Sequence, residues 1–389
     1  MRDDEQAPMQ TVRELLSIRY DQHDLHTWQA RISDLTAALR VLSSDEARLL
    51  AQEVWGRYDH NKIVRFLGQL TTAVPGALAE WSVAFVAQGY IVPSWLYLDA
   101  PPSTTRQLIA LFDQPEVVTQ CDHLLQALAW IGDDLVREQF RAWREAPPPW
   151  QSHLFLASHE YAITAGWELT REGGRRDLYW QTSYELIPAD EPEFTPSQHA
   201  VAVSTPTDET CGWCGRKLVA LLDIDLQDPR CAFVVEGEEA SNTVGRRLRI
   251  AHCRWCSSYT TLYTDVDLDG RVRWSDANGD MPSILQKVGL GADDELPPPA
   301  AQRLVLGAQR RTPFEAVGRF LLDEPGISQL GGHPDWIQDA EFPVCPGCQR
   351  RMRCIGQVSW EDIEEFAEGS TYAFLCLPCG KGATTYQQT

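Results

Sequence analysis

The sequence predicts an α+β protein with an all-α N-terminal half and a β-rich C-terminal half that carries two four-cysteine metal sites. Apolar residues recur at helical spacing from about Thr11 to Arg144. After residue 210, eight cysteines fall in four C-x-x-C pairs, and short alternating segments between the pairs indicate strands. The chain of 389 residues is 43% hydrophobic and contains 14 Trp, so it can bury the cores of two or three domains.

The first predicted domain covers residues 1–165 and is helical. Ser43 followed by Glu46 forms a capping-box pattern, which marks the start of a helix. The segment Leu124–Phe140 has two apolar helical faces separated by a Gly-Asp pair, and it looks like the turn between the two helices of a HEAT unit. We therefore expect either a HEAT-like stacked array or an irregular helical bundle.

Proline-rich stretches predict the remaining boundaries. Four prolines interrupt the second half of residues 166–206, which we expect to be an irregular connection. Pro297–Pro299 separate residues 207–296 from residues 300–389, each predicted to be one β-rich unit. Both units open with a C-x-x-C pair, a strand and acidic residues, so they look like an internal duplication. In the second unit, Thr312-Pro-Phe-Glu315 has the pattern of a helix start and predicts a helix over Ala316–Leu322.

Each β-rich unit offers four thiolates to one metal ion. The two predicted sets are Cys211, Cys214, Cys253 and Cys256 in the first unit, and Cys345, Cys348, Cys376 and Cys379 in the second. A C-x-x-C turn brings two sulfurs to about 2.3 Å from one ion, and Gly215 and Gly380 directly after a pair suit such a turn. We predict two structural zinc ions, although iron uses the same ligands and stays open. Four protein ligands leave no position for water, which favours a structural role over catalysis.

Charge and cysteine content narrow the class of protein. The formal charge is 34 − 55 = −21, which repels phosphate backbones, so we do not expect nucleic acid as the partner. The 11 cysteines are an odd number in a chain with no recognisable signal peptide, which argues against a secreted disulfide framework. No apolar run is long enough to predict a membrane span. We therefore expect a cytoplasmic protein; the sequence does not indicate its oligomeric state.

Acidic motifs offer alternatives to a purely structural metal protein. Asp265–Gly270 resembles the opening of an EF-hand loop, but its flanks alternate as strands, so we expect an acidic hairpin and no calcium. Asp223 and Asp225 have a spacing compatible with paired carboxylates, yet a solvated strand face is the simpler interpretation. Recognisable catalytic motifs are mostly absent. We expect a protein that is not an enzyme, with a hydrolytic enzyme built on an unrecognised carboxylate site as one alternative.

The C-terminal motifs resemble a known family. Gly331-Gly-His-Pro-Asp-Trp336 is followed by Cys345-Pro-Gly-Cys348, Ile355-Gly-Gln357 and a strand from Tyr372 to Cys376. In this order the motifs resemble the YwqG-like proteins and their eukaryotic relatives, the programmed cell death protein 2 family of ribosomal-protein chaperones. The resemblance covers Pro313 to the C-terminus and, through the duplication, extends toward Pro206.

This resemblance implies a duplicated β-rich domain without an established enzymatic activity. It also implies a protein partner, either a client or a toxin that the protein neutralises. Trp336 and Gln357 are the candidate partner-binding residues, with a core position as the alternative for Trp336. We therefore expect a zinc-binding protein that binds a basic protein partner as an immunity-type protein or a client chaperone. A nucleic-acid-binding zinc ribbon is a further alternative, based on the basic segments Gly245–Arg249 and Gln349–Arg353.

Overall fold

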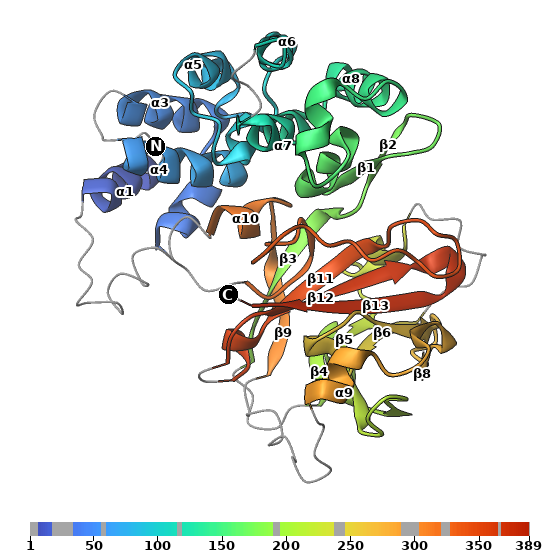
Figure 1. The fold of residues 1–389 in the computed structure, drawn as a ribbon. Coiled ribbons are helices and arrows are strands. Elements are labelled where there is room, and N and C mark those ends of the chain that lie inside the picture. The colour runs from blue at the N-terminus through green and yellow to red at the C-terminus, as the bar shows by residue number, and fades with distance from the viewer. Residues whose placement is uncertain are drawn as a thin grey trace. The chain divides into compact units, whose positions relative to one another are not determined.

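The fold is described from a computed structural model, in two compact units (Figure 1). Unit 1 comprises Met1–Asp177 and Phe314–Glu324, and unit 2 comprises Leu178–Pro313 and Pro325–Thr389. The structure describes residues 7–17, 34–55, 60–114, 119–189, 195–236, 246–288, 303–319, 327–364 and 367–388. Unit 1 is mainly helical and unit 2 holds a large antiparallel sheet, so the predicted α+β class is confirmed.

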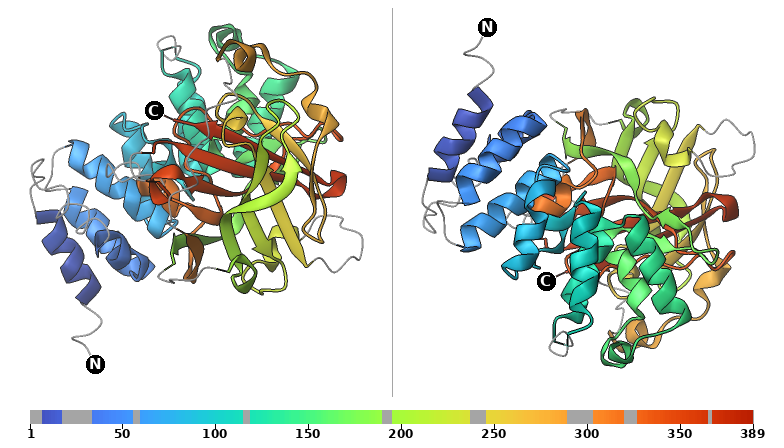
Figure 2. Two further views of the ribbon diagram at one scale, coloured as in Figure 1. Left: turned by 90° about the horizontal axis from the view of Figure 1, so that it is seen from below. Right: turned by 90° about the horizontal axis from the view of Figure 1, so that it is seen from above.

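Unit 1 consists of short helices and one small hairpin (Figures 1 and 2). Its helices are α1 (Ala7–Ser17), α3 (Ser44–Trp55), α4 (His60–Ala73), α5 (Ser82–Ala87), α6 (Pro102–Leu111), α7 (Cys121–Ile131), α8 (Asp134–Glu145) and α10 (Glu315–Arg319). The hairpin pairs β1 (Trp167–Leu169) with β2 (Arg175–Asp177). The helical character of the N-terminal half is thus confirmed, while a HEAT-like arrangement stays a prediction.

Local sequence signals set three of these helix ends. The Ser43 amide donates to Glu46 Oε2 at 2.8 Å and the Glu46 amide donates to Ser43 Oγ at 3.3 Å, so the predicted capping box starts α3. Gly132 ends α7 in the left-handed region, at φ 57°. Asp133 then starts α8, because its carboxylate accepts a hydrogen bond from the Val136 amide at 2.8 Å. The Gly-Asp pair therefore forms the predicted turn between two helices.

Helix α10 reaches unit 1 from a distant part of the chain and packs against α4 (Figure 2). Arg40 Nε donates to Glu315 Oε2 at 2.9 Å, and the Glu315 side chain is buried. A Cβ atom at Gly318 would overlap the side chain of Thr72, so the two helices are in close contact. The predicted helix after Thr312 exists, but it starts at Glu315, its last predicted residues lie outside the described residues, and it belongs to the helical unit rather than to a β-rich one.

Unit 2 is built on one 11-stranded sheet whose neighbouring strands are antiparallel. The strand order is β6-β5-β4-β9-β3-β10-β11-β12-β13-β7-β8. The strands are β3 (Trp180–Pro188), β4 (Val201–Thr210), β5 (Lys217–Asp225), β6 (Arg247–His252), β7 (Leu262–Val266), β8 (Val272–Trp274), β9 (Leu304–Arg311), β10 (Gln329–Gly332), β11 (Arg353–Ser359), β12 (Ser370–Cys376) and β13 (Lys381–Gln387). One short helix, α9 (Ser283–Val288), follows β8.

The structure corrects the predicted connection over residues 166–206, because β1, β2, β3 and the start of β4 lie within it. Proline lacks an amide donor, yet it is tolerated at strand ends and at irregularities of a sheet. Pro188 is the last residue of β3, and Pro206 lies in β4 where the register with β5 shifts. Pro188 and Pro206 thus mark a strand end and a bulge, Pro196 begins a short 3-10 helix, and Pro192 lies outside the described residues.

The two predicted β-rich units, residues 207–296 and 300–389, do not form separate domains. Strand β7 of the first segment pairs with β13 of the second. Within each segment the elements nevertheless follow the same order: a C-x-x-C pair, two antiparallel strands, a second C-x-x-C pair and a further strand. The repeated order is that expected of a duplication whose two copies share one sheet.

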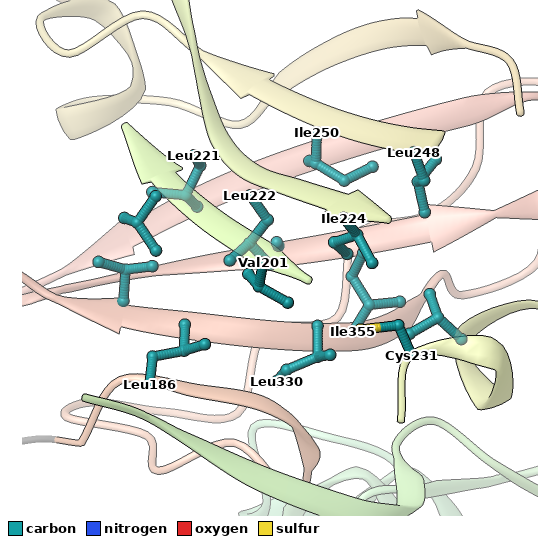
Figure 3. Packing of buried hydrophobic residues seen from close by; sticks show 14 of the residues in the cluster. Leu186, Val201, Leu221, Leu222, Ile224, Cys231, Leu248, Ile250, Leu330 and Ile355 are labelled. Atoms are coloured by element: carbon teal, nitrogen blue, oxygen red, sulfur yellow. The ribbon is translucent and has the colours of Figure 1, made fainter. Parts of the chain in front are cut away.

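The core of unit 2 is formed by buried side chains of β4, β5 and β6 together with those of β10, β11 and β12 (Figure 3). Leu222 and Ile224 of β5 and Ile250 of β6 point toward Leu330 of β10 and Ile355 of β11, and all five side chains are buried. Burial of a side chain of this size contributes about 1.5–3 kcal/mol. This core fixes the strands whose ends carry the cysteine pairs. In the described part of the chain, no helix is both long and apolar enough to cross a membrane.

Candidate metal centres

The eight paired cysteines gather in two clusters, grouped as the sequence predicts. In each cluster the four sulfur atoms lie within 4.8 Å of one another. The N-terminal centre consists of Cys211, Cys214, Cys253 and Cys256, and the C-terminal centre of Cys345, Cys348, Cys376 and Cys379. Each centre joins two turns that lie far apart in the sequence.

The strands of the core place these turns. In the N-terminal centre, one pair lies between β4 and β5 and the other between β6 and β7. In the C-terminal centre, one pair precedes β11 and the other joins β12 to β13. Because β5 pairs with β6 and β11 with β12, the two turns of each centre are brought to the same end of a strand pair.

The first turn of both centres has the same backbone geometry. The Gly215 amide donates to the Cys211 carbonyl at 2.9 Å, and the Gln349 amide donates to the Cys345 carbonyl at 2.9 Å. Both residues have a positive φ, 72° for Gly215 and 59° for Gln349. Glycine adopts this conformation without steric cost, as predicted for Gly215, whereas Gln349 adopts it against the ordinary preference. The shared turn aims two sulfurs of each pair at one point.

The spacing of the sulfur atoms fits a tetrahedral ion. Four sulfurs placed about 2.3 Å from a central ion lie roughly 3.8 Å apart. The Sγ atoms are 3.8 Å apart in Cys211 and Cys256, 3.5 Å in Cys214 and Cys253, and 3.7 Å in Cys348 and Cys376. A disulfide would need a distance of about 2.05 Å. Both centres could therefore hold a metal ion, and both zinc and iron suit this ligand set.

Hydrogen bonds between the thiols of the N-terminal centre shift their pKa values in opposite directions. In the N-terminal centre, hydrogen bonding with Cys211 holds the pKa of Cys214 well below its usual value. Hydrogen bonding with Cys211 also has the largest effect on Cys256, whose pKa it raises far above the usual value. The opposite shifts mean that a protonated thiol donates to an ionised neighbour in this cluster. A divalent ion would replace those protons and bind all four sulfurs as thiolates.

A small apolar core of its own surrounds the N-terminal centre. Trp213 packs edge-on against Trp274 with ring centroids 5.0 Å apart, and its Nε1 donates to the Gly279 carbonyl at 3.2 Å. Leu285 of α9 is buried in the same cluster. The segment that follows β8 therefore covers this centre.

In the C-terminal centre the two turns are in close contact, but the cysteines are more exposed to solvent than those of the N-terminal centre. Cys345 and Cys376 are buried, whereas Cys379 is half-buried and Cys348 is exposed. A Cβ atom at Gly347 would lie 3.0 Å from Cys379 Sγ. A residue with a side chain at this position would force Cys379 to shift by a few tenths of an ångström.

Replacing Gly347 with alanine is expected to weaken metal binding at the C-terminal centre. The added methyl group would push Cys379 away from the other three sulfurs. Substitutions that disturb the groups around metal ligands typically lower the affinity for the metal about 10–100-fold. Competition titration with a chelator measures this affinity. Pro346→Ala is the control, because it changes the neighbouring position and keeps glycine at 347. Wild-type affinity in Gly347→Ala would contradict the close approach.

The three other cysteines are buried. Burial raises the pKa of Cys231 and of Cys354 to about 12, so both are neutral thiols at physiological pH. Cys121, in unit 1, is also buried, and burial raises its pKa. These residues act as small apolar side chains, as predicted for Cys354.

The structure corrects the expected role of Gln357 and places Trp336 in an aromatic cluster. Gln357 is 0% exposed; its Oε1 accepts from the Asp335 amide and its Nε2 donates to the Ile327 carbonyl, each at 2.7 Å. A partner cannot reach this side chain. Trp336 is half-buried, with its ring centroid 4.5 Å from that of Tyr372 and 5.1 Å from that of Phe342.

Buried polar side chains on neighbouring strands hold the segment that contains Trp336. Gln329, Gln357 and Tyr372 lie opposite one another on β10, β11 and β12. Gln329 Nε2 donates to the His333 carbonyl at 2.8 Å, and Tyr372 Oη donates to the Asp335 carbonyl at 2.6 Å. The motif thus begins within β10, and its later residues are tied to the side chains of these three strands. A glutamine in the middle of a predicted strand can indicate that its side chain holds a neighbouring segment. The sequence does not show which backbone groups it would bind.

The predicted solvated face at Asp223 is wrong. Asp223 is 0% exposed; its Oδ2 accepts from Arg249 Nε at 3.0 Å and from Thr205 Oγ1 at 3.2 Å, and Arg247 also pairs with it. Asp225 accepts a hydrogen bond from the Gln227 amide at 2.9 Å instead. The buried carboxylate of Asp223 pairs with two arginines, which explains why its charge is tolerated inside this sheet.

Three arginines of the basic segments considered for nucleic-acid binding contact other side chains of unit 2. Arg247 and Arg249 belong to the Asp223 cluster, and Gly245 lies outside the described residues. In the other segment, the guanidinium of Arg353 lies 4.1 Å from the ring centroid of Trp180. These side chains have partners within unit 2.

The predicted acidic hairpin is confirmed. Strands β7 and β8 pair as an antiparallel hairpin. Asp267 Oδ1 accepts from the amides of Asp269 and Arg271 at 2.9 and 3.0 Å, and Asp265 pairs with Lys381. These carboxylates organise a turn between strands rather than the helix-flanked loop of an EF-hand.

Fold and centres together define an α+β protein with two four-cysteine sites that could hold metal ions. The chain is similar to the uncharacterized protein YpfL of Salmonella typhimurium (strain LT2), with 36% identity over 299 residues. The match covers 75% of this chain and 64% of the relative. No protein family model matches the chain. No solved structure matches it either.

Proposed function

We propose that the protein is a zinc-binding protein without enzymatic activity that binds a protein partner. The observation that carries the zinc proposal is the pair of four-sulfur clusters, whose spacing of 3.5 to 3.8 Å matches a tetrahedral ion. Cysteine fills all four positions of each centre, so neither ion would keep a site for water or substrate. The ions would then hold the turns of unit 2 in place.

The proposed partner is a basic protein. The net charge of −21 favours encounter with a positively charged surface and disfavours nucleic acid. The sequence resemblance to YwqG-like proteins suggests either an immunity-type role, in which the partner is a toxin, or a chaperone role, in which it is a client.

Metal analysis and affinity capture test the two parts of this proposal separately. Protein purified under reducing conditions is expected to contain about two zinc ions per chain. Capture from a native lysate at low salt is expected to recover a basic protein that elutes as the salt concentration rises, because screening weakens charge attraction. An unrelated acidic protein of similar net charge serves as the control bait.

Each part has its own contrary result. Freely titratable paired thiols without bound metal would refute the zinc proposal. Recovery of the same proteins on the control bait would refute a specific basic partner, and recovery of salt-sensitive RNA instead would favour the nucleic-acid alternative.

A further inference from the structure

We infer that the two centres differ in metal exchange: the C-terminal centre gives up its ion to external chelating or thiolate ligands, whereas the N-terminal centre retains its own. This inference rests on the proposed metal binding and concerns the fate of the ions after binding. It follows from three differences between the centres, namely the exposure of the sulfurs, the surrounding side chains and the surface position of one turn.

The sulfur atoms differ first in exposure. In the N-terminal centre, Cys211, Cys253 and Cys256 are at most 1% exposed, and Cys214 is half-buried. In the C-terminal centre, Cys348 is exposed and Cys379 is half-buried. An incoming ligand can therefore approach the C-terminal ion beside Cys348 without any movement of the core.

The surrounding side chains differ in the same direction. Trp213, Trp274 and Leu285 cover the N-terminal centre as part of one apolar cluster that includes three of its cysteines. Opening this centre would require separating Trp213 from Trp274 and from the Gly279 carbonyl. Access to the three buried cysteines thus depends on local unfolding of the segment after β8.

At the C-terminal centre, the first turn lies at the surface. Gln349 and Arg350, which follow Cys348, are exposed, and Val344 before the turn is 41% exposed. Gln349 also has a positive φ of 59°, a conformation that is unfavourable for a residue with a side chain. Release of this turn would relieve that strain, whereas the equivalent Gly215 stores none.

The exchange step is a substitution of ligands without a change in oxidation state. A donor atom of the acceptor would take the place of Cys348 Sγ on the ion, and the freed thiolate would either stay ionised or take a proton from a buffer acid. The other three sulfurs are then replaced in turn, and the ion leaves bound to the acceptor. Suitable acceptors are multidentate chelators and thiolate-rich ligands, which bind zinc through the same donor types.

The test follows release of zinc from the full-length protein into excess chromogenic chelator. The expected trace has two phases of about one ion each, with the first more than about tenfold faster than the second. Cys348→Ser is expected to abolish the fast phase and leave one slowly released ion. Cys214→Ser, the matched change at the half-buried position of the N-terminal centre, is expected to leave the fast phase.

Alkylation with iodoacetamide and peptide mass spectrometry provides a second measurement on the wild-type protein. Chelator treatment is expected to expose Cys348 and Cys379 to modification before Cys211 and Cys256. Two ions released at one common rate, or a fast phase that survives in Cys348→Ser, would overturn the inference and leave the zinc proposal intact. Absence of bound metal would overturn both.

Discussion

Replacing Cys345 with serine is expected to reduce the bound metal from about two ions per chain to about one and to loosen the C-terminal part of unit 2. Cys345 is fully buried, and its amide donates to the Arg350 carbonyl at 2.8 Å within the first turn. The free energy of zinc binding to a structural site, about 10–16 kcal/mol, is available only to the folded chain. We therefore expect a loss of at least about 3 kcal/mol in the stability of this region.

Metal analysis and limited proteolysis measure these effects. New cleavage is expected first in the segment from residue 343 to 388, which holds both turns of the C-terminal centre. Cys354→Ala is the control, because Cys354 is a buried cysteine of β11 outside both clusters. That variant is expected to keep two ions. Two ions in Cys345→Ser would show that the four sulfurs do not share one metal.

Replacing Asp223 with asparagine is expected to destabilise unit 2 by about 3 kcal/mol, because the loss of one partner from a buried ion pair leaves the other charge uncompensated. Asp223 is 0% exposed and pairs with both Arg247 and Arg249. The side chains of these arginines are 20% and 33% exposed, so partial hydration keeps the cost at the low end of the usual range.

Urea unfolding, followed by a probe of unit 2, measures this change. Asp225→Asn is the matched control on the same strand, since an asparagine oxygen can still accept the hydrogen bond from the Gln227 amide. We expect its stability to change by less than about 0.5 kcal/mol. Equal effects of the two substitutions would contradict the role of Asp223 as the buried charge that pairs with both arginines.

The cysteine clusters could be predicted because their signal is local and chemically restrictive. A C-x-x-C turn orients two sulfurs by itself, and two such turns in one β-rich segment satisfy one tetrahedral ion. The same holds for helix ends: the Ser43 and Glu46 hydrogen bonds and the Gly132 turn depend only on residues within one turn of chain.

Long-range pairing could not be predicted, because an alternating strand is compatible with many neighbours. Nothing in the sequence of β7 indicates β13 as its partner, so two segments that share a sheet were expected to be separate units. Proline was misleading for a related reason, since Pro188 and Pro206 disfavour a central regular strand but fit a strand end and a bulge. The polar character of Asp223 and Gln357 suggested exposed side chains. Instead, the charge of Asp223 is paired and the amide of Gln357 is hydrogen-bonded inside the fold.

The position of α10 has a consequence for the order in which the chain is made. Unit 1 needs Phe314–Glu324, but the 136 residues of Leu178–Pro313 are synthesised between Asp177 and that segment. At about 5–20 residues per second, translation of this stretch takes roughly 7–27 s. Throughout that time Arg40 lacks Glu315 and the surface of α4 that receives α10 stays open. The helical unit, although first in the sequence, is therefore completed only after most of the sheet has left the ribosome.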